Sequence, residues 1–286
     1  MDFLSVDHQP GRKLSTLLIA FSGWADAAEG ATSAVKFLKR KLKAQKFAEF
    51  DPEDFYDFSQ TRPTTTRTRD GKRHIHWPAN EFFHIENPDT GDGLMLFTGV
   101  EPNLRWRTYS QGVARLAAEQ GVETVVHVGA LLDAVPHTRP VKLSGTATRP
   151  DLSEFLEGRE IRSSNYQGPT GISSSVMDAC VKQGLGYSSI WGHTPHYLQA
   201  APNYRVAYTL LQIMTRLLHL PLDLEELRGA ASKFDEEVAK AVQADEQIGS
   251  YVAKLEGQYD ESVADSTIPD PEDLVRDVER FLRGER

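Results

Sequence analysis

Polar residues follow the apolar runs of this 286-residue sequence, at the points where those runs end. Trp24 and Asp26 come after the run 14–21, Glu101 follows 94–97, and Asp133 follows 124–128. A carboxylate and an imidazole held together can do general acid/base work, and a guanidinium can bind an anion. Whether these side chains act together depends on the elements that place them.

The segment 133–139 (DAVPHTR) combines one acid, one imidazole and one guanidinium within seven residues. One interpretation is an anion site, in which Arg139 binds the ligand and His137 serves as donor or acid/base. The other interpretation is a structural turn in which these charges pair with one another. The sequence leaves both open.

The segment 166–171 (YQGPTG) precedes a predicted helix and contains Gln167, Gly168, Thr170 and Gly171. Glycines allow close approach, and the free N–H groups of a helix N-terminus attract anions. The alternative is an ordinary glycine/proline loop with a helix cap. The segment is not a phosphate loop, because it lacks the lysine and the spacing of that motif.

Asp26 and Glu29 stand at the start of a predicted helix with apolar positions at Ala31, Val35 and Leu38. Their three-residue spacing resembles a capping box, in which both side chains serve only to begin the helix. The functional interpretation is a carboxylate pair at the edge of a sheet.

His193 and His196 have a spacing that resembles a metal motif. Pro195 lies between them and both are predicted to follow a strand, so their rings need not face the same point; we predict no metal. His127 lies within a buried run and is interpreted as a core histidine.

Complete catalytic motifs are missing: there is no nucleophile elbow, zinc-protease motif, Walker loop or dinucleotide fingerprint. We therefore predict no cofactor and assign no catalytic residues. The candidate ligand-binding residues are Trp24, Asp26, Glu29, Glu101, Asp133, His137, Arg139, Gln167, Gly168, Thr170, Gly171 and His196.

The elements that carry these residues alternate between strands and helices. Apolar runs predict strands at 14–21, 94–97, 124–128 and 187–191, and an alternating run predicts another at 141–148. Helical periodicity predicts helices over 103–120, 171–183 and 204–220. This alternation implies an α/β fold with a mostly parallel sheet between helices, which binds ligands beyond the carboxyl ends of its strands.

Two regions break the alternation. Residues 47–86 are predicted to form a β-rich insertion that covers or extends one edge of the sheet, with a hairpin at Asp70-Gly71. Beyond Pro221, apolar stripes predict helices over 227–242 and 248–259, and residues 274–281 predict a short last helix. We therefore expect an α/β core at 1–222 and a helical C-terminal region at 223–286.

Charge is concentrated in the second of these regions. The net charge of the chain is −9, and residues 223–286 contain 18 acidic and 8 basic side chains. The basic segments at 36–46 and 62–76 suggest a nucleic-acid groove, which is the weakest of the functional alternatives. We predict no nucleic-acid partner, because that function needs a basic face.

The location of the protein is also predicted from composition. Residues 1–7 lack the basic and apolar pattern of a secretory signal, and no apolar run approaches the roughly 18 residues of a membrane helix. The single cysteine, Cys180, fits a reducing compartment. We expect a cytoplasmic protein without a membrane partner.

Five segments form a further pattern: 23–27 (GWADA), 101–106 (EPNLRW), 129–140 (GALLDAVPHTRP), 168–171 (GPTG) and 195–197 (PHY). Together they resemble the proteasome assembly chaperone 2 family, and most closely its actinobacterial branch. The segment 129–140 is the most specific of them, and the resemblance covers nearly the whole chain. One departure is Ala28, where the family often has glycine after the Asp-Ala pair.

The resemblance implies a three-layer αβα sandwich, similar in shape to nucleoside phosphorylases, with a small helical C-terminal region. It also implies a homo-oligomer, with a trimer as the state to test. Eukaryotic and archaeal relatives help to assemble proteasomes. The ending 283–286 (RGER) differs from the hydrophobic-Tyr-X ending with which some archaeal relatives dock, so docking by that mode is not expected.

Two functions follow. The first is an oligomeric binding or assembly factor without established catalysis, in which the acidic C-terminal helices offer a surface to a protein partner. The alternative is a hydrolase or phosphorylase-like enzyme that acts on a small anionic or nucleoside-like substrate. Its site would lie at the strand ends and use the candidate residues above.

Overall fold

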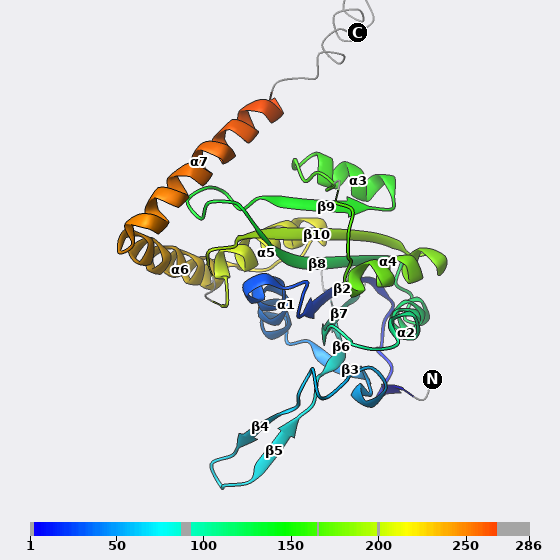
Figure 1. Ribbon diagram of the computed structural model, residues 1–286. Coiled ribbons are helices and arrows are strands. Elements are labelled where there is room, and N and C mark those ends of the chain that lie inside the picture. Colours follow the sequence, from blue (N-terminus) through cyan, green and yellow to red (C-terminus); the bar gives the residue numbers. More distant parts are fainter. Residues whose placement is uncertain (1–2, 87–92, 165, 199–200, 268–286) are drawn as a thin grey trace, which may run out of the picture.

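An eight-stranded sheet forms the middle layer of the molecule, and helices cover both of its faces (Figure 1). The computed structural model describes residues 3–86, 93–164, 166–198 and 201–267. The strand order is β1-β3-β6-β7-β2-β8-β10-β9. The predicted three-layer α/β sandwich is confirmed.

The four central strands run parallel. They are β7 (Gly93–Val100), β2 (Leu14–Ser22), β8 (Thr124–Asp133) and β10 (Gly186–Pro195). Their side chains are mostly buried on both faces, as expected of continuous apolar runs in a parallel sheet. All four strands therefore end at the same edge, where the polar residues predicted from the sequence gather.

The outer strands are antiparallel, so the sheet is mixed. β9 (Leu143–Ala147) pairs with β10 at one edge. At the other edge, β6 (Asn80–Glu86), β3 (Gln45–Phe50) and β1 (Leu4–Val6) continue the sheet beyond β7. Part of the segment 47–86 thus extends this edge.

A separate hairpin projects from the body of the molecule (Figure 1). It consists of β4 (Thr64–Arg67) and β5 (Arg73–His76), and every residue of both strands is exposed. The turn contains Gly71 at a φ of 85°, a conformation that glycine adopts without steric cost. The hairpin predicted at Asp70-Gly71 is confirmed.

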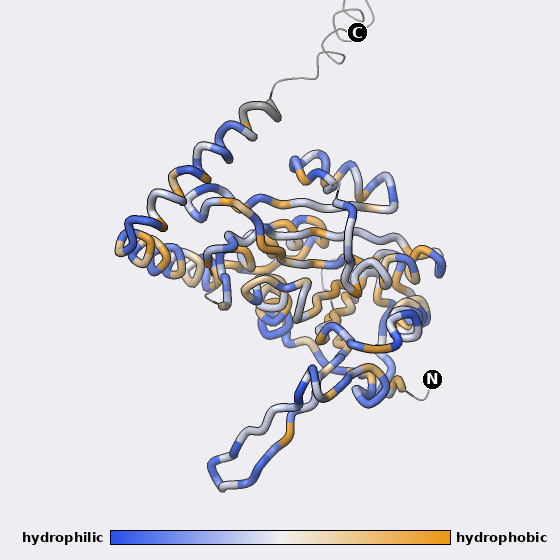
Figure 2. Tube along the Cα trace, viewed as in Figure 1, coloured by the Kyte–Doolittle hydropathy of each residue, from blue (hydrophilic) through white to orange (hydrophobic). Residues whose placement is uncertain are grey.

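The helices form two layers, and the pleat of the strands divides the core between them. α1 (Gly30–Lys41) and α5 (Tyr204–Leu217) cover one face, where Leu18 and Ala20 of β2 point. α2 (Trp106–Glu119) and α4 (Ile172–Lys182) cover the other face, toward Leu17, Ile19 and Phe21. Hydrophobic colour accordingly concentrates where strands and helices meet (Figure 2).

Several boundaries differ from those that the sequence predicted. β8 reaches Asp133 and β10 reaches Pro195, so both extend into segments predicted as loops. α2 begins at Trp106 because Arg105 adopts a left-handed conformation with a φ of 53°. The short helix α3 (Pro150–Glu157) was not predicted. Two single-turn helices are also present: η1 (Ala27–Glu29) directly before α1, and η2 (Pro52–Asp54) after β3.

The C-terminal region begins with α6 (Glu225–Gln243), which buries Leu227 in the core cluster beside α5. α7 (Glu246–Thr267) follows and extends away from the sandwich (Figure 1). The predicted last helix at 274–281 lies outside the described residues, and the division of the chain at 222/223 stays a prediction. In the described part of the chain, no helix is long and apolar enough to cross a membrane.

Candidate functional site

Asp26 follows β2 and caps helix α1. Its Oδ1 accepts hydrogen bonds from the backbone N–H groups of Ala31 (2.8 Å) and Thr32 (3.2 Å), and Oδ2 accepts one from the Thr32 hydroxyl. The side chain is buried, and this burial raises the pKa of its carboxyl group despite the donors. The carboxylate therefore acts inside the fold as a helix cap.

Glu29 does not complete the predicted capping box, and that half of the interpretation is wrong. It has a φ of 53° at the join between η1 and α1, and makes no side-chain capping bond. Its exposed carboxylate lies 3.7 Å from the Nζ atom of Lys36. The structure therefore does not place Asp26 and Glu29 together as a carboxylate pair.

Glu101 follows β7 and caps α4, a helix distant in the sequence. Its Oε1 accepts a hydrogen bond of 2.8 Å from the backbone N–H of Ile172. A Cβ atom at Gly171 would lie 3.0 Å from that oxygen and 3.1 Å from the ring of Trp24. Glycine therefore allows three separate segments to meet, and the structure brings these three candidate residues together.

The rest of the segment 166–171 forms an exposed loop before α4. The Tyr166 hydroxyl donates to the carbonyl of Pro169 at 3.1 Å, which folds the loop around Gly168 and Gln167, and Thr170 shares a hydrogen bond with Ser174. The N–H of Ile172, at the start of α4, is already bonded to Glu101. This arrangement favours the interpretation of the segment as a loop with a helix cap.

His137 and His196 hold the loop after β8 against its neighbours. The Tyr197 hydroxyl lies 2.8 Å from both the backbone nitrogen and Nδ1 of His137, and burial lowers the pKa of this histidine. His196 places Nδ1 3.0 Å from the carbonyl oxygen of Asp133 and Nε2 3.2 Å from the Tyr251 hydroxyl on α7. Both imidazoles therefore make structural contacts.

Arg139 binds α7 instead of pairing with Asp133. Its Nε and Nη2 atoms donate to the two carboxylate oxygens of Asp260 at 2.8 and 2.7 Å, and Nη1 donates to Glu256 at 3.3 Å. These contacts raise the pKa of the guanidinium further above its ordinary value. The charged turn of 133–139 thus anchors the C-terminal helix, with a partner that the local sequence could not indicate.

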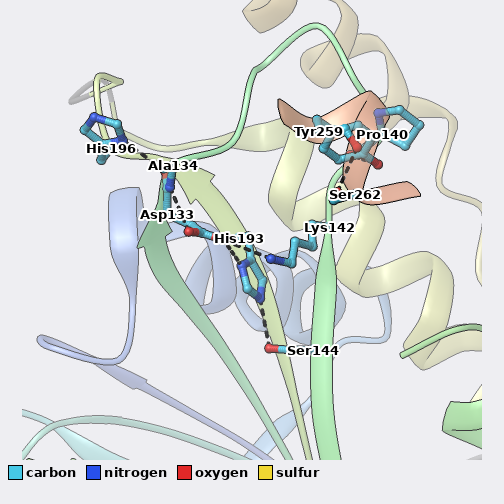
Figure 3. A network of polar contacts seen from close by, with 9 residues as sticks. All are labelled: Asp133, Ala134, Pro140, Lys142, Ser144, His193, His196, Tyr259 and Ser262. Atoms are coloured by element: carbon cyan, nitrogen blue, oxygen red, sulfur yellow. Dashed lines mark hydrogen bonds and ion pairs between the residues drawn. The ribbon is translucent and has the colours of Figure 1, made fainter. Parts of the chain in front are cut away.

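Asp133 belongs to a different network, which joins three strands (Figure 3). Its Oδ2 lies 2.6 Å from Nδ1 of His193 on β10, and Nε2 of that ring lies 2.9 Å from Oγ of Ser144 on β9. The Nζ atom of Lys142 lies 3.3 Å from the same carboxylate oxygen. Within one network, the chain places an acid, an imidazole, a hydroxyl and an ammonium group.

Sequence reasoning missed most of this network. It set His193 aside as part of an improbable metal pair, and it did not select Ser144 or Lys142. The alternating run 141–148 places both of those residues on one face of a strand, which is the only local signal. The register that brings β9 beside β10 is a tertiary property.

The histidines do not form a metal site with each other. Both ring nitrogens of His193 contact Asp133 or Ser144, and those of His196 contact Asp133 and Tyr251. Across residues 3–86, 93–164, 166–198 and the described part of 201–267, no group of three metal-binding side chains is assembled.

A groove of about 740 Å³ lies between α2 and α4, away from all of these residues. Polar residues such as Arg107, Gln111, Arg115 and Lys182 line it. A smaller hollow of about 400 Å³ includes His137, Arg139, Arg205 and Asp235. The candidate residues are therefore divided among separate clusters, and their assignment as ligand-binding residues stays a prediction.

The fold and these clusters define a class of protein: a three-layer α/β sandwich whose strand-end residues mainly cap helices and anchor the C-terminal arm. The model of the PAC2 family matches residues 20–242, and the chain belongs to this family. The resemblance seen in the sequence is confirmed.

Solved structures agree with this membership. A PAC2 family protein from Streptomyces avermitilis is 35% identical, with a TM-score of 0.73 over 83% of this chain and 99% of that chain. A Mycobacterium tuberculosis proteasome-assembly chaperone homologue is 32% identical, with a TM-score of 0.75 and the same coverage. A Mycobacterium tuberculosis protein of unknown function is 25% identical over 92% of this chain and 90% of its own, with a TM-score of 0.83. Among curated proteins, none matches this sequence.

Proposed function

We propose that this protein is a cytoplasmic, oligomeric assembly factor that acts by binding other proteins. One observation carries the proposal: the strand-end polar groups are engaged within the fold, while aromatic side chains beside them stay exposed. Trp24 is 63% exposed and Tyr166 is 64% exposed, on segments that meet at Gly171 and the loop before α4. Exposed apolar groups with polar surroundings are typical of protein-binding surfaces.

A second copy of the chain is the proposed occupant of this aromatic surface, which consists of Trp24 and Tyr166. Its fixed geometry supports this choice, because Glu101 holds the start of α4 against the Trp24 segment. A trimer is the expected state. Aromatic anchors on a rigid support give interfaces much of their binding energy.

The acidic C-terminal helices are proposed to contact the assembly partner. Residues 223–286 have a net charge of −10, against −9 for the whole chain, and α7 extends from the sandwich (Figure 1). Complementary charge speeds association, so the expected partner surface is basic. The proteasome is the first partner to test, because the Mycobacterium tuberculosis relative is described as a proteasome-assembly chaperone homologue.

Light scattering coupled to size exclusion tests the oligomer. The wild type should elute as an oligomer at micromolar concentration, and Trp24→Ala should shift the mass toward the monomer. Trp77→Ala removes another exposed tryptophan, 49% exposed near the hairpin, and should leave the mass unchanged. A monomeric wild type would refute the oligomer.

A reconstitution experiment tests the assembly function. Purified proteasome subunits from the source organism should form the complete particle faster in the presence of this protein, as followed on native gels. Replacing Glu236 on α6 and Glu261 on α7 by glutamine should reduce that effect, since both carboxylates are exposed and both changes weaken the acidic surface. An assembly rate that the wild type does not change would argue against the proteasome as partner.

A further inference from the structure

The network of Ser144, His193 and Asp133 has the geometry of a nucleophile, a base and an orienting carboxylate (Figure 3). Ser144 Oγ lies 2.9 Å from His193 Nε2, and the opposite ring nitrogen lies 2.6 Å from Asp133 Oδ2. These distances lie within the range over which a base activates a hydroxyl. We propose that this cluster is an esterase site in which Ser144 is the nucleophile.

The carboxylate is held in the state that this role requires. The backbone N–H of Ala134 donates to Asp133 at 2.7 Å, and Lys142 lies 3.3 Å from it. Together with the hydrogen bond from His193, these contacts hold the pKa of the Asp133 carboxyl group well below its usual range. An ionised aspartate fixes the tautomer of the imidazole and stabilises the imidazolium that forms when the serine loses its proton.

The nucleophile lies on the edge strand of the sheet. Ser144 is buried, with 9% of its surface exposed, whereas Lys142 just before β9 and Thr146 on β9 are both exposed. Trp191 is half-buried and directly opposite Ser144 in the ladder between β9 and β10. Residues paired in this way point to the same face, so Ser144 and Trp191 share a face of the sheet, where the indole packs over Gly129 and beside His127 on β8.

This surface fits a small carboxylic ester. The acyl group would lie against Trp191, and the carbonyl carbon would face Ser144. Lys142 pairs with Asp133, so the positive charge beside the developing oxyanion is the imidazolium of His193, whose Nε2 lies 2.9 Å from Ser144 Oγ. Because Ser144 is only 9% exposed, small activated esters with short acyl chains should react best.

The reaction balances without any additional reagent. Ser144 Oγ forms a bond to the carbonyl carbon while its proton passes to His193 Nε2. The ester C–O bond then breaks, and the alcohol leaves with that proton. Water attacks the acyl-serine, again giving a proton to His193, and the collapse of this intermediate releases the carboxylic acid and restores the protonated serine.

A fluorophosphonate probe and p-nitrophenyl acetate test the proposal on the full chain. Mass spectrometry should locate the phosphonyl adduct on Ser144, and Ser144→Ala should abolish it. His193→Gln should slow labelling by about 100-fold, as expected when a general base is lost. Thr146→Ala is the matched control, because it changes the same face of β9 without touching the network; its labelling rate should equal that of wild type.

A purely structural network would give a different result. In that case Ser144→Ala and Asp133→Asn would lower the melting temperature, yet the folded wild type would carry no adduct on Ser144. That outcome overturns the proposal, as does labelling of folded His193→Gln at the wild-type rate. If His193→Gln does not fold, Asp133→Asn gives the same test. Because the oligomeric state is measured separately, failure here leaves the proposed assembly function intact.

Discussion

Glu101 accepts a hydrogen bond of 2.8 Å from the backbone N–H of Ile172, so a carboxylate that follows β7 caps a helix 71 residues later in the chain. The contact joins the end of a central strand to the start of α4 and holds Trp24 beside Gly171. It therefore connects the stability of the fold with the shape of the aromatic surface.

Glu101→Ala should lower the free energy of unfolding by about 1 kcal/mol, since it removes a helix cap and a negative charge at a helix N-terminus. Glu101→Gln retains an acceptor oxygen and should lose about half as much. Urea denaturation at pH 7 measures both. Equal stability of Glu101→Ala and wild type would show that the cap contributes nothing.

His127 should make the protein sensitive to mild acid. It is fully buried on β8 beside Phe21 and Trp191, and neither ring nitrogen has a hydrogen-bond partner among the described residues. Burial lowers its pKa from 6.5 to about 3. Between these values the unfolded chain binds a proton that the folded chain does not, so stability falls as the pH falls below 6.5.

His127→Leu removes this dependence. Between pH 7 and pH 5 the wild type should lose about 2 kcal/mol of unfolding free energy more than the variant, because only its unfolded state binds the additional proton. At pH 7 it should be close to wild type, because it replaces an unpartnered polar ring by an apolar side chain. Urea denaturation at the two pH values measures the change, and parallel profiles for both proteins would contradict it.

Ala28 adopts a left-handed conformation, with φ of 49° and ψ of 36°. This position is the one where the family resemblance led us to expect glycine, and its carbonyl accepts a hydrogen bond from Asn203 at 2.8 Å. Ala28→Gly relieves the backbone strain of the folded state, but it also raises the conformational entropy of the unfolded chain. The free energy of unfolding should therefore rise by between zero and about 1 kcal/mol.

Ala118→Gly is the matched control for that substitution. Ala118 lies in the last turn of α2 with helical backbone angles, so the same change should destabilise the protein, by at most about 1 kcal/mol. Ala28→Val should also destabilise it, because a β-branched residue is strained at positive φ. Thermal melting measures all three variants. If the left-handed backbone at Ala28 controls the result, the melting temperature should not fall for Ala28→Gly and should fall for Ala118→Gly and Ala28→Val. Equal destabilisation by Ala28→Gly and Ala118→Gly would contradict this role of the backbone.

Arg139 should control the attachment of α7. Its ion pairs with Glu256 and Asp260 lie near a contact of 3.3 Å between the Tyr259 hydroxyl and the carbonyl of Pro140. Arg139→Ala should speed amide hydrogen exchange throughout α7 while the strands β2 and β8 keep their protection. The same loss should appear in wild type at high salt, because exposed ion pairs are screened.

Arg159→Ala serves as a control for the loss of a surface arginine. The side chain of Arg159 lies over the ring of Phe155 near α3, away from α7. Its substitution should leave exchange in α7 unchanged. If Arg139→Ala and Arg159→Ala give the same exchange pattern, the helix is held by its apolar contacts through Val252 and Leu255.

Local patterns predicted most of the elements. The run 14–21 became β2, and the helical stripe through Val206, Leu210 and Ile213 became the buried face of α5. Such patterns predict the elements because a helix or strand that buries one face needs apolar residues at its own period along the sequence. Turn chemistry acts over equally short distances, which explains why the hairpin at Asp70-Gly71 was predictable.

The site was less predictable, because its contacts cross long sequence separations. Arg139 was expected either to bind an anion or to pair within its own turn, yet it contacts Asp260 on α7. Asp26 was expected to cap the helix together with Glu29, yet it bonds to Ala31 and Thr32. Asp26 thus caps the predicted helix without Glu29, whereas the packing of α7 against the loop after β8 decided the partner of Arg139.

The amino-acid sequence by itself determined the α/β class, the family and the strand-end position of the polar groups, because periodicity and short motifs depend on neighbouring residues. The tertiary structure alone decided that β8 and β10 continue far enough to place Asp133 beside His193, and that β9 brings Ser144 to the same ring. Strand pairing sets that register through contacts along whole strands, and no local pattern of residues encodes it.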